Sequence, residues 1–176
     1  MGLDAYVNTF GAVCKARYGT RLRKLTIDAK FTCPNRDGTL GRGGCTFCNV
    51  ASFSHQTADV LSITEQLEQG KSRYREAKPQ AQADKFIAYF QAYTSTYDEY
   101  QVLMAKYDEA VKDGEIVGLC VGTRPDCVPN NVLDLLARYQ ENGVDVWLEL
   151  GLQTAKDETL RRINRGHDFA CFCDTV

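Results

Sequence analysis

The sequence predicts an α/β fold, a partial TIM-like (βα) barrel with about four parallel βα units. Short apolar segments centred near residues 26, 88, 119 and 148 alternate with segments of helical periodicity. The last two intervals are about thirty residues long, which is the size of one βα unit. Polar residues follow each apolar segment, as they follow the strands of such barrels. We therefore expect parallel strands joined by right-handed crossovers, with a site on the loops at their carboxyl ends.

The composition is that of a folded, water-soluble domain. The chain has 176 residues, of which 44% are hydrophobic and 25% charged, so it can bury a core. It contains no apolar run of about 18 residues, and its first residues do not combine a basic segment with an apolar one. We therefore expect no membrane span, no membrane partner and no signal peptide, and we expect a cytoplasmic protein.

Cysteine content and charge both draw attention to the first part of the chain. Eight cysteines without a secretory signal indicate metal or redox chemistry in a reducing compartment, in preference to disulfides. Residues 1–50 carry eight Lys/Arg and three Asp/Glu, a net charge of +5, whereas the remainder carries −7. The positive charge suits an anionic cofactor or an RNA phosphate, and it suits a solvated basic face equally well.

The first elements can be placed from periodicity and capping signals. Residues 3–18 put their apolar side chains on one helical stripe, which predicts a leading helix that ends at Gly19. Residues 23–29 alternate apolar and polar side chains, which predicts the first strand. A Ser-x-x-Glu capping box opens residues 62–78, which predicts a helix that ends before Pro79.

The second half of the chain repeats the pattern of strand and helix. Residues 85–91 form a continuous apolar and aromatic run, typical of a strand covered on both faces. The expected elements that follow are a helix over 98–112, a strand over 116–122, a helix over 130–142, a strand over 144–152 and a short helix over 155–163. This predicts three parts: an N-terminal helix (1–22), a core (23–168) and a tail (169–176).

The segment from residue 31 to residue 53, which we call the cysteine loop, follows the first strand. Cys33, Cys45 and Cys48 form a C-x11-C-x2-C pattern there, and thiolates at such spacing bind zinc or an iron–sulfur cluster. Three thiolates on a cubane cluster leave one iron open to a small molecule. A closed structural zinc site needs a fourth ligand, for which the candidates are His55, Cys14 and Cys127.

The sequence gives less support for other roles of the cysteines. A dithiol redox pair at Cys45 and Cys48 would be expected at a helix start in a thioredoxin-like order of elements, which this sequence lacks. Cys14 and Cys120 lie on apolar faces, so we expect small core residues there. Cys127 follows the third strand and could serve the site. Cys171 and Cys173 lie in the tail, for which the sequence predicts no structure.

The loop also resembles a known motif. Cys45-Thr46-Phe47-Cys48 is similar to the C-x-Φ-C half of the cysteine motif of the radical S-adenosylmethionine (SAM) superfamily. The long first gap, with CPNRDGT beginning at Cys33, resembles the branch that contains the catalytic subunit of Elongator and the bacterial YhcC-type proteins. Further similar segments are YFQAYTSTY (89–97), GTRPDCVP (122–129), ELGLQT (149–154) and INRGHD (163–168).

The resemblance implies a radical enzyme. Cys33, Cys45 and Cys48 would hold a [4Fe-4S] cluster whose open iron binds SAM. An electron from a flavodoxin- or ferredoxin-like donor would release a 5′-deoxyadenosyl radical, which abstracts hydrogen from an unknown substrate. RNA is a possible substrate by analogy with Elongator alone. The family core has more βα units than the four counted here, so we expect the C-terminal units to be missing. The alternative function is a truncated, non-catalytic interaction domain that binds zinc or an iron–sulfur cluster.

The resemblance also names candidate ligands for SAM. It implies that Phe47 lies beside the adenine and that the segment from Gln91 to Thr94 meets the methionine amino group. Gln153 and Arg165 resemble SAM-binding residues of related enzymes, and Arg165 could pair with the ligand carboxylate by bidentate bonds. Two further candidates, Arg124 and Glu149, could instead form ion pairs at strand ends. No side chain is identified as catalytic.

Overall fold

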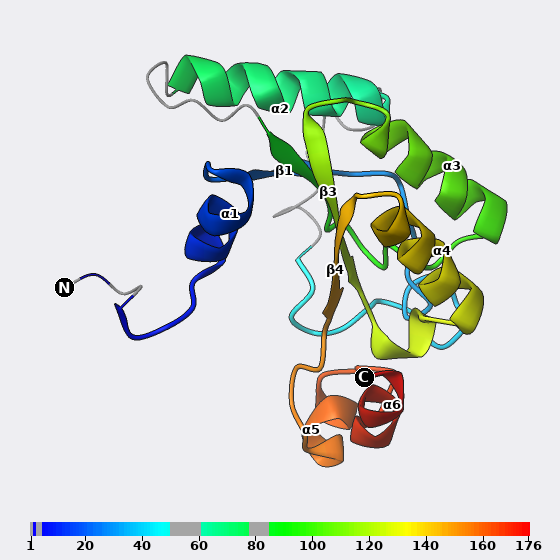
Figure 1. Cartoon of the computed structure of the whole chain (residues 1–176). Coiled ribbons are helices and arrows are strands. Elements are labelled where there is room, and N and C mark those ends of the chain that lie inside the picture. Colours follow the sequence, from blue (N-terminus) through cyan, green and yellow to red (C-terminus); the bar gives the residue numbers. More distant parts are fainter. Residues whose placement is uncertain (1, 3–4, 50–60, 78–84) are drawn as a thin grey trace.

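The computed structural model describes residues 2, 5–49, 61–77 and 85–176. Four strands form one parallel sheet in the order β1-β2-β3-β4, as the sequence predicts (Figure 1). The strands are β1 (Arg23–Ile27), β2 (Phe86–Phe90), β3 (Ile116–Thr123) and β4 (Asp145–Leu150). Because all four run in one direction, their carboxyl ends lie at the same edge of the sheet. The architecture is that of a partial (βα) barrel.

Three helices cover one face of this sheet, and one helix lies against the other face. The covering helices are α2 (Ile63–Ala77), α3 (Tyr100–Val111) and α4 (Asn130–Glu141), and Figure 1 shows them on the side opposite α1 (Phe10–Tyr18). Phe10 of α1 packs edge-on against Trp147 of β4, with ring centroids 5.5 Å apart. Each crossover between strands therefore places its helix on the same face.

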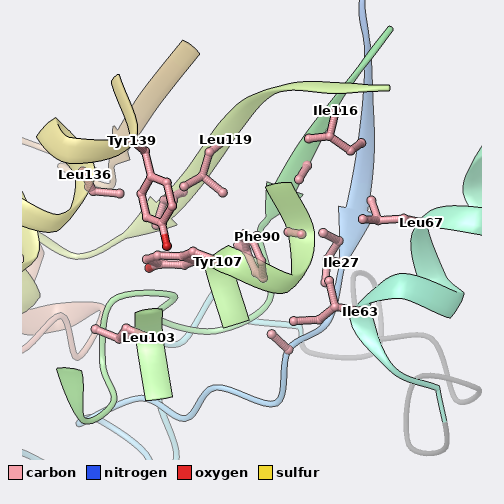
Figure 2. Packing of buried hydrophobic residues seen from close by; sticks show 14 of the residues in the cluster. Ile27, Ile63, Leu67, Phe90, Leu103, Tyr107, Ile116, Leu119, Leu136 and Tyr139 are labelled. Atoms are coloured by element: carbon pink, nitrogen blue, oxygen red, sulfur yellow. The ribbon is translucent and has the colours of Figure 1, made fainter. Parts of the chain in front are cut away.

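The main core lies between the sheet and α2, α3 and α4 (Figure 2). Tyr107 of α3 is fully buried and its ring lies edge-on to Phe90 of β2, at 5.2 Å between centroids. Its hydroxyl donates a hydrogen bond to the carbonyl of Ser95 at 2.5 Å, so the buried polar atom is satisfied. Burial of each large apolar side chain contributes about 1.5–3 kcal/mol.

Side chains of β2 alternate between the two faces. Phe86, Ala88 and Phe90 belong to the main core, whereas Ile87 and Tyr89 pack on the opposite face. This confirms the prediction of a strand covered on both sides. On the opposite face a second, smaller cluster contains Cys14, Leu22, Ile87 and Cys120, so the prediction that Cys14 and Cys120 are small core residues is also confirmed.

The leading helix is shorter than predicted. It begins at Phe10 instead of residue 3, because the Thr9 side chain accepts a hydrogen bond from the Ala12 amide at 3.2 Å and so caps the helix there. Tyr6 and Val7 precede the helix and are exposed, so the apolar stripe over these positions is not buried. Leu3 lies outside the described residues. The helix ends as predicted at Gly19, whose φ is 71°.

The remaining boundaries agree with the sequence within two residues. Ser62 and Glu65 form the predicted capping box of α2, with backbone-to-side-chain distances of 2.8 and 3.2 Å. The predicted end of that helix at residues 78–79 lies outside the described residues. After β4 come α5 (Asp157–Arg162) and α6 (Phe169–Thr175), and the latter shows that the tail is helical. Thr175 donates to the carbonyl of Pro125 at 3.1 Å, in the short 3₁₀ helix η4 (Pro125–Cys127). Within the described ranges, no helix is long and apolar enough to cross a membrane.

Candidate functional site

A cavity of about 460 Å³ opens at the carboxyl ends of the strands. Segments that follow β1, β2, β3 and β4 all contribute to its lining. The ten residues that the sequence proposes as cluster ligands or SAM-binding residues all line this one cavity: Cys33, Cys45, Phe47, Cys48, Gln91, Thr94, Arg124, Glu149, Gln153 and Arg165. The structure therefore brings together residues that are up to 132 positions apart because parallel strands end at a common edge.

The cysteine loop is folded tightly at its second and third cysteines. Gly43 and Gly44 have φ values of 83° and 80°, a conformation that glycine adopts without strain. A Cβ atom at Gly44 would lie 2.7 Å from the guanidinium of Arg36, so a larger residue would collide there. The amide of Cys48 donates to the carbonyl of Cys45 at 3.0 Å, which forms the turn between these two ligand candidates. Residues 50–53 of the loop lie outside the described residues.

The three thiols are free, and each lines the cavity. Among the described residues, no three His, Cys, Asp or Glu side chains converge on a position for a single metal ion. The thiolates of an iron–sulfur cluster bind different irons and do not need to meet at one point. The soft donors, their shared cavity and the glycine-rich backbone around them fit a cluster.

The candidates for a fourth zinc ligand lie elsewhere. Cys14 lies on α1 and is buried in a cluster with Leu22 and Ile87. Cys127 lines a different cavity, of about 890 Å³, and burial together with Asp126 raises the pKa of its thiol to about 12. His55 lies outside the described residues.

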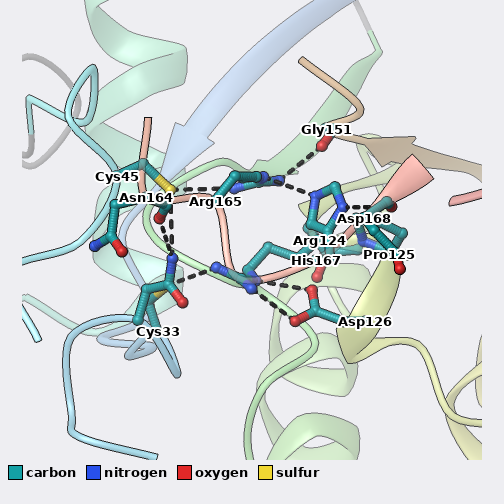
Figure 3. A network of polar contacts seen from close by, with 12 residues as sticks. Cys33, Cys45, Arg124, Pro125, Asp126, Gly151, Asn164, Arg165, His167 and Asp168 are labelled. Atoms are coloured by element: carbon teal, nitrogen blue, oxygen red, sulfur yellow. Dashed lines mark hydrogen bonds and ion pairs between the residues drawn. The ribbon is translucent and has the colours of Figure 1, made fainter. Parts of the chain in front are cut away.

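Three buried side chains direct N–H groups at the cysteine sulfurs. Asn35 Nδ2 lies 3.6 Å and Arg165 Nη1 lies 3.7 Å from the Sγ of Cys45. Arg124 Nη1 lies 3.9 Å from the Sγ of Cys33. Figure 3 shows the side chains of both arginines extending toward the cysteines. Because a metal-bound cysteine is an anionic thiolate, these donors and cations fit the ligand set of a cluster.

Arg124 is held in place by an acidic partner two residues further on. Its Nε and Nη2 donate to the two carboxylate oxygens of Asp126 at 2.9 and 2.6 Å, a bidentate pair. Burial alone would lower the pKa of Arg124, but the Asp126 carboxylate outweighs it and the pKa is raised. The guanidinium is thus fixed as a cation with its Nη1 facing Cys33.

Arg165 is held differently. Its Nη2 donates to the carbonyl of Gly151 at 2.7 Å, and its Nε donates to Nε2 of His167 at 2.8 Å. His167 accepts this bond in its neutral form, and burial lowers its pKa, which favours that form. His167 is not among the residues that line this cavity, and it contacts the site through Arg165.

Glu149 belongs to a polar network on the sheet face that carries α1. Its carboxylate accepts from Lys24 Nζ at 2.5 Å, from the Tyr89 hydroxyl at 2.7 Å and from the Cys120 thiol at 3.3 Å. Burial and the adjacent carboxylate raise the pKa of the Cys120 thiol to about 12. Glu149 therefore lines the cavity and also forms the strand-end ion pair considered as its other role.

The remaining predicted residues occupy different parts of the lining. Phe47 is exposed over half of its surface, whereas Thr94 is buried. The Thr94 amide donates to the carbonyl of Thr32 at 3.2 Å, which ties the segment after β2 to the cysteine loop. Gln153 has a φ of 71°, which is uncommon for a residue other than glycine.

The sequence did not single out two asparagines that shape the site. Asn35 contacts Cys45, and Asn164 Nδ2 donates to the carbonyl of Gly44 at 2.8 Å. Both stand in segments that carry the family resemblance, but an amide has neither charge nor nucleophilicity to distinguish it in a sequence. Only proximity in the fold reveals their role.

Comparison with known proteins agrees with this geometry. The family model of the Radical SAM superfamily matches residues 36–176. Protein YhcC of Escherichia coli (strain K12) is 58% identical over 176 residues, which are 100% of this chain and 55% of that protein. YtqA of Bacillus subtilis (strain 168) is 39% identical over 166 residues, covering 92% of this chain and 49% of that protein.

A shorter similarity connects the chain with a eukaryotic protein. Elongator complex protein 3 of Schizosaccharomyces pombe is 37% identical over 73 residues, which are 39% of this chain and 13% of that protein. The chain spans about half the length of the two bacterial relatives. On this evidence the chain belongs to the radical SAM superfamily, in its YhcC-type branch, with partial similarity to the Elongator subunit.

Proposed function

We propose that this chain binds a [4Fe-4S] cluster through Cys33, Cys45 and Cys48 and binds SAM beside it, as the core of a radical enzyme. The observation that carries the proposal is the single cavity lined by the three thiols and by polar side chains from the ends of β2, β3 and β4. At about 460 Å³ it is within the range of cavities that hold small-molecule cofactors.

The chemistry would come from the cofactors. When bound, they would supply one-electron cleavage of the sulfonium C–S bond, with the electron from a flavodoxin- or ferredoxin-like donor, to give a 5′-deoxyadenosyl radical that abstracts hydrogen. The names of the relatives specify no substrate, so the proposal concerns the cofactors and the radical.

The side chains of the cavity would bind and orient SAM. Phe47 offers an exposed ring that would pack beside the adenine. Gln91 and Thr94 line the same cavity and would bind the methionine amino group. Gln153 and Arg165 provide an amide and a cation for the carboxylate. A guanidinium has five N–H groups, so Arg165 can retain its bonds to Gly151 and His167 and still donate to a ligand.

Two further residues would act mainly by electrostatics. Arg124 is a buried cation beside Cys33, and Glu149 is a carboxylate fixed by Lys24 and Tyr89. Together with Arg165, they give the cavity charged groups of both signs, which suits a zwitterionic amino-acid moiety such as that of SAM.

Anaerobic reconstitution of the chain with iron and sulfide tests this proposal. We expect iron and sulfide to bind in the ratio of a [4Fe-4S] cluster, and we expect 5′-deoxyadenosine to form from SAM under reduction. Cys45→Ala should abolish cluster binding, whereas Cys173→Ala should not, because Cys173 is exposed on α6 and does not line the cavity.

Two results would contradict the proposal. Stoichiometric zinc with no cleavage of SAM would favour the alternative of a metal-binding interaction domain. Full iron content in Cys45→Ala would show that the ligand set is wrong.

A further inference from the structure

Asn35 is placed to act on the sulfur of Cys45. Its side chain is 2% exposed, and its Nδ2 donates to two acceptors, the Sγ of Cys45 at 3.6 Å and the carbonyl of Asn164 at 2.7 Å. An amide nitrogen carries two hydrogens, so both bonds can form together. The carbonyl of Asn164 therefore aligns the amide with one hydrogen directed at the sulfur.

Arg165 is a second donor to the same sulfur. It is 7% exposed, and among the described residues its guanidinium forms no ion pair with a carboxylate. A buried cation is costly unless a negative charge compensates it. Its Nη1 lies 3.7 Å from the Sγ of Cys45, and a metal-bound cysteine is an anion. A cluster on Cys45 would thus supply the missing negative charge.

The backbone around these donors holds the turn after α5 against the cysteine loop and leaves space for the Asn35 amide. Asn164 Nδ2 donates to the carbonyl of Gly44 at 2.8 Å, and the Thr46 amide donates to the carbonyl of Ile163 at 3.0 Å, so the turn after α5 is bound to the cysteine loop on two sides. A Cβ atom at Gly166 would lie 2.4 Å from Oδ1 of Asn35, so only glycine leaves room for the amide.

We propose that Asn35 and Arg165 are positioning residues that donate N–H groups to the Cys45 thiolate and raise the reduction potential of the cluster. This inference rests on the proposed function. Reduction adds negative charge to a cluster and its thiolates, so donors and cations beside the sulfur stabilise the reduced form more than the oxidised form. Arg124 near Cys33 acts in the same direction over a longer distance of 3.9 Å.

The test compares two asparagines that both hold the loop but of which only one contacts sulfur. Asn35→Leu removes the donor to Cys45 with a side chain of similar size. Asn164→Gly removes the bond to Gly44 and preserves the backbone conformation, because Asn164 has a φ of 54°. The midpoint potential of each reconstituted chain is measured by a redox titration followed by electron paramagnetic resonance, and loss of iron to a chelator is measured in parallel.

We expect Asn35→Leu to shift the potential to more negative values. At a fixed potential, the ratio of reduced to oxidised cluster should fall about tenfold. For a one-electron couple this corresponds to a shift of about 59 mV in the midpoint potential. Asn164→Gly should release iron faster and leave the potential unchanged. Arg162→Gln is the charge control for Arg165→Gln, because Arg162 is exposed at the end of α5, and only Arg165→Gln should lower the potential.

Two outcomes would overturn the inference. The first is an unchanged potential in Asn35→Leu and Arg165→Gln. The second is an equal shift in Asn35→Leu and Asn164→Gly, which would attribute the effect to a loosened loop. If Asn35→Leu does not bind iron, Asn35→Ser replaces it with the same expected direction. Failure of the parent chain to bind a cluster is a different result, since that would refute the proposed function.

Discussion

The two faces of the sheet differ in chemistry. The face beneath α2, α3 and α4 is apolar, with side chains such as Ile27, Phe90 and Leu119 buried almost completely. The opposite face carries a polar network in which Lys24, Tyr89 and Cys120 all contact Glu149, which lines the cavity. We therefore expect the apolar face to contribute most of the stability, whereas the contacts of the other face fix the position of the Glu149 carboxylate at the end of β4.

Both faces depend on the same strands, so their register is shared. In β2, Phe90 faces the helices while its neighbour Tyr89 reaches Glu149. A shift of one residue would exchange these roles, because side chains alternate along a strand. The apolar face therefore fixes where the polar side chains of the other face lie.

The largest effect should come from the apolar face. Phe90→Ala is expected to lower the free energy of unfolding by about 3–5 kcal/mol, because it leaves a cavity between Phe31 and Tyr107. Urea denaturation followed by circular dichroism measures it. A loss below about 1 kcal/mol would show that this face does not dominate stability.

A smaller effect is expected on the polar face one residue away. Tyr89→Phe removes the hydroxyl that donates to Glu149 at 2.7 Å and leaves the ring in place. The expected loss is about 1 kcal/mol, the typical net contribution of a hydrogen bond. The same urea measurement applies, and a loss as large as that of Phe90→Ala would erase the difference between the faces.

The polar face should also make the stability of the fold depend on pH, because it carries the ionised Glu149 carboxylate. Burial raises the pKa of Glu149, but the bonds from Lys24 and Tyr89 outweigh it and leave the pKa below its ordinary value of 4.5. The carboxylate therefore stabilises the fold above pH 4.5, and this contribution is lost as the pH falls through the folded-state pKa. Glu149→Gln should weaken the pH dependence of unfolding in that acid range, and an unchanged acid profile would contradict the pairing.

The smallest effect should come from the outer side of the helices. Leu133 of α4 is 38% exposed, whereas Leu135 and Leu136 are buried against the sheet. Leu133→Gln is expected to change the free energy of unfolding by less than about 0.5 kcal/mol, as surface substitutions usually do. A larger loss in thermal or urea unfolding would mean that α4 packs on more than one side.

The order of elements could be predicted because periodicity is local. Apolar runs and helical stripes placed all four strands, both ends of α3 and α4, and the start of α2 within two residues of their bounds. Periodicity also misplaced the start of α1, because the Thr9 cap, and not the apolar stripe, decides where that helix begins. The tail gave no signal, yet α6 forms there, with its start capped by Asp168 and its end bound to Pro125.

The position of the candidate site could also be predicted, from the order of the strands and the loops that follow them. Strand ends in a parallel sheet meet, so residues from four loops could be assigned to one cavity before the fold was known. Asn35 and Asn164 were missed because their role depends on contacts across the chain, 129 residues apart in the case of the bond between them. The division into residues 1–22, 23–168 and 169–176 stays a prediction, as does the ligand set itself.

We propose above that Cys33, Cys45 and Cys48 hold a cluster whose open iron binds SAM in the cavity. Electron paramagnetic resonance of the reduced, reconstituted chain with and without SAM tests it most directly. We expect SAM to change the spectrum of the cluster in the parent chain, because its amino and carboxylate groups would bind the open iron. A cluster whose spectrum is the same with and without SAM would contradict the claim.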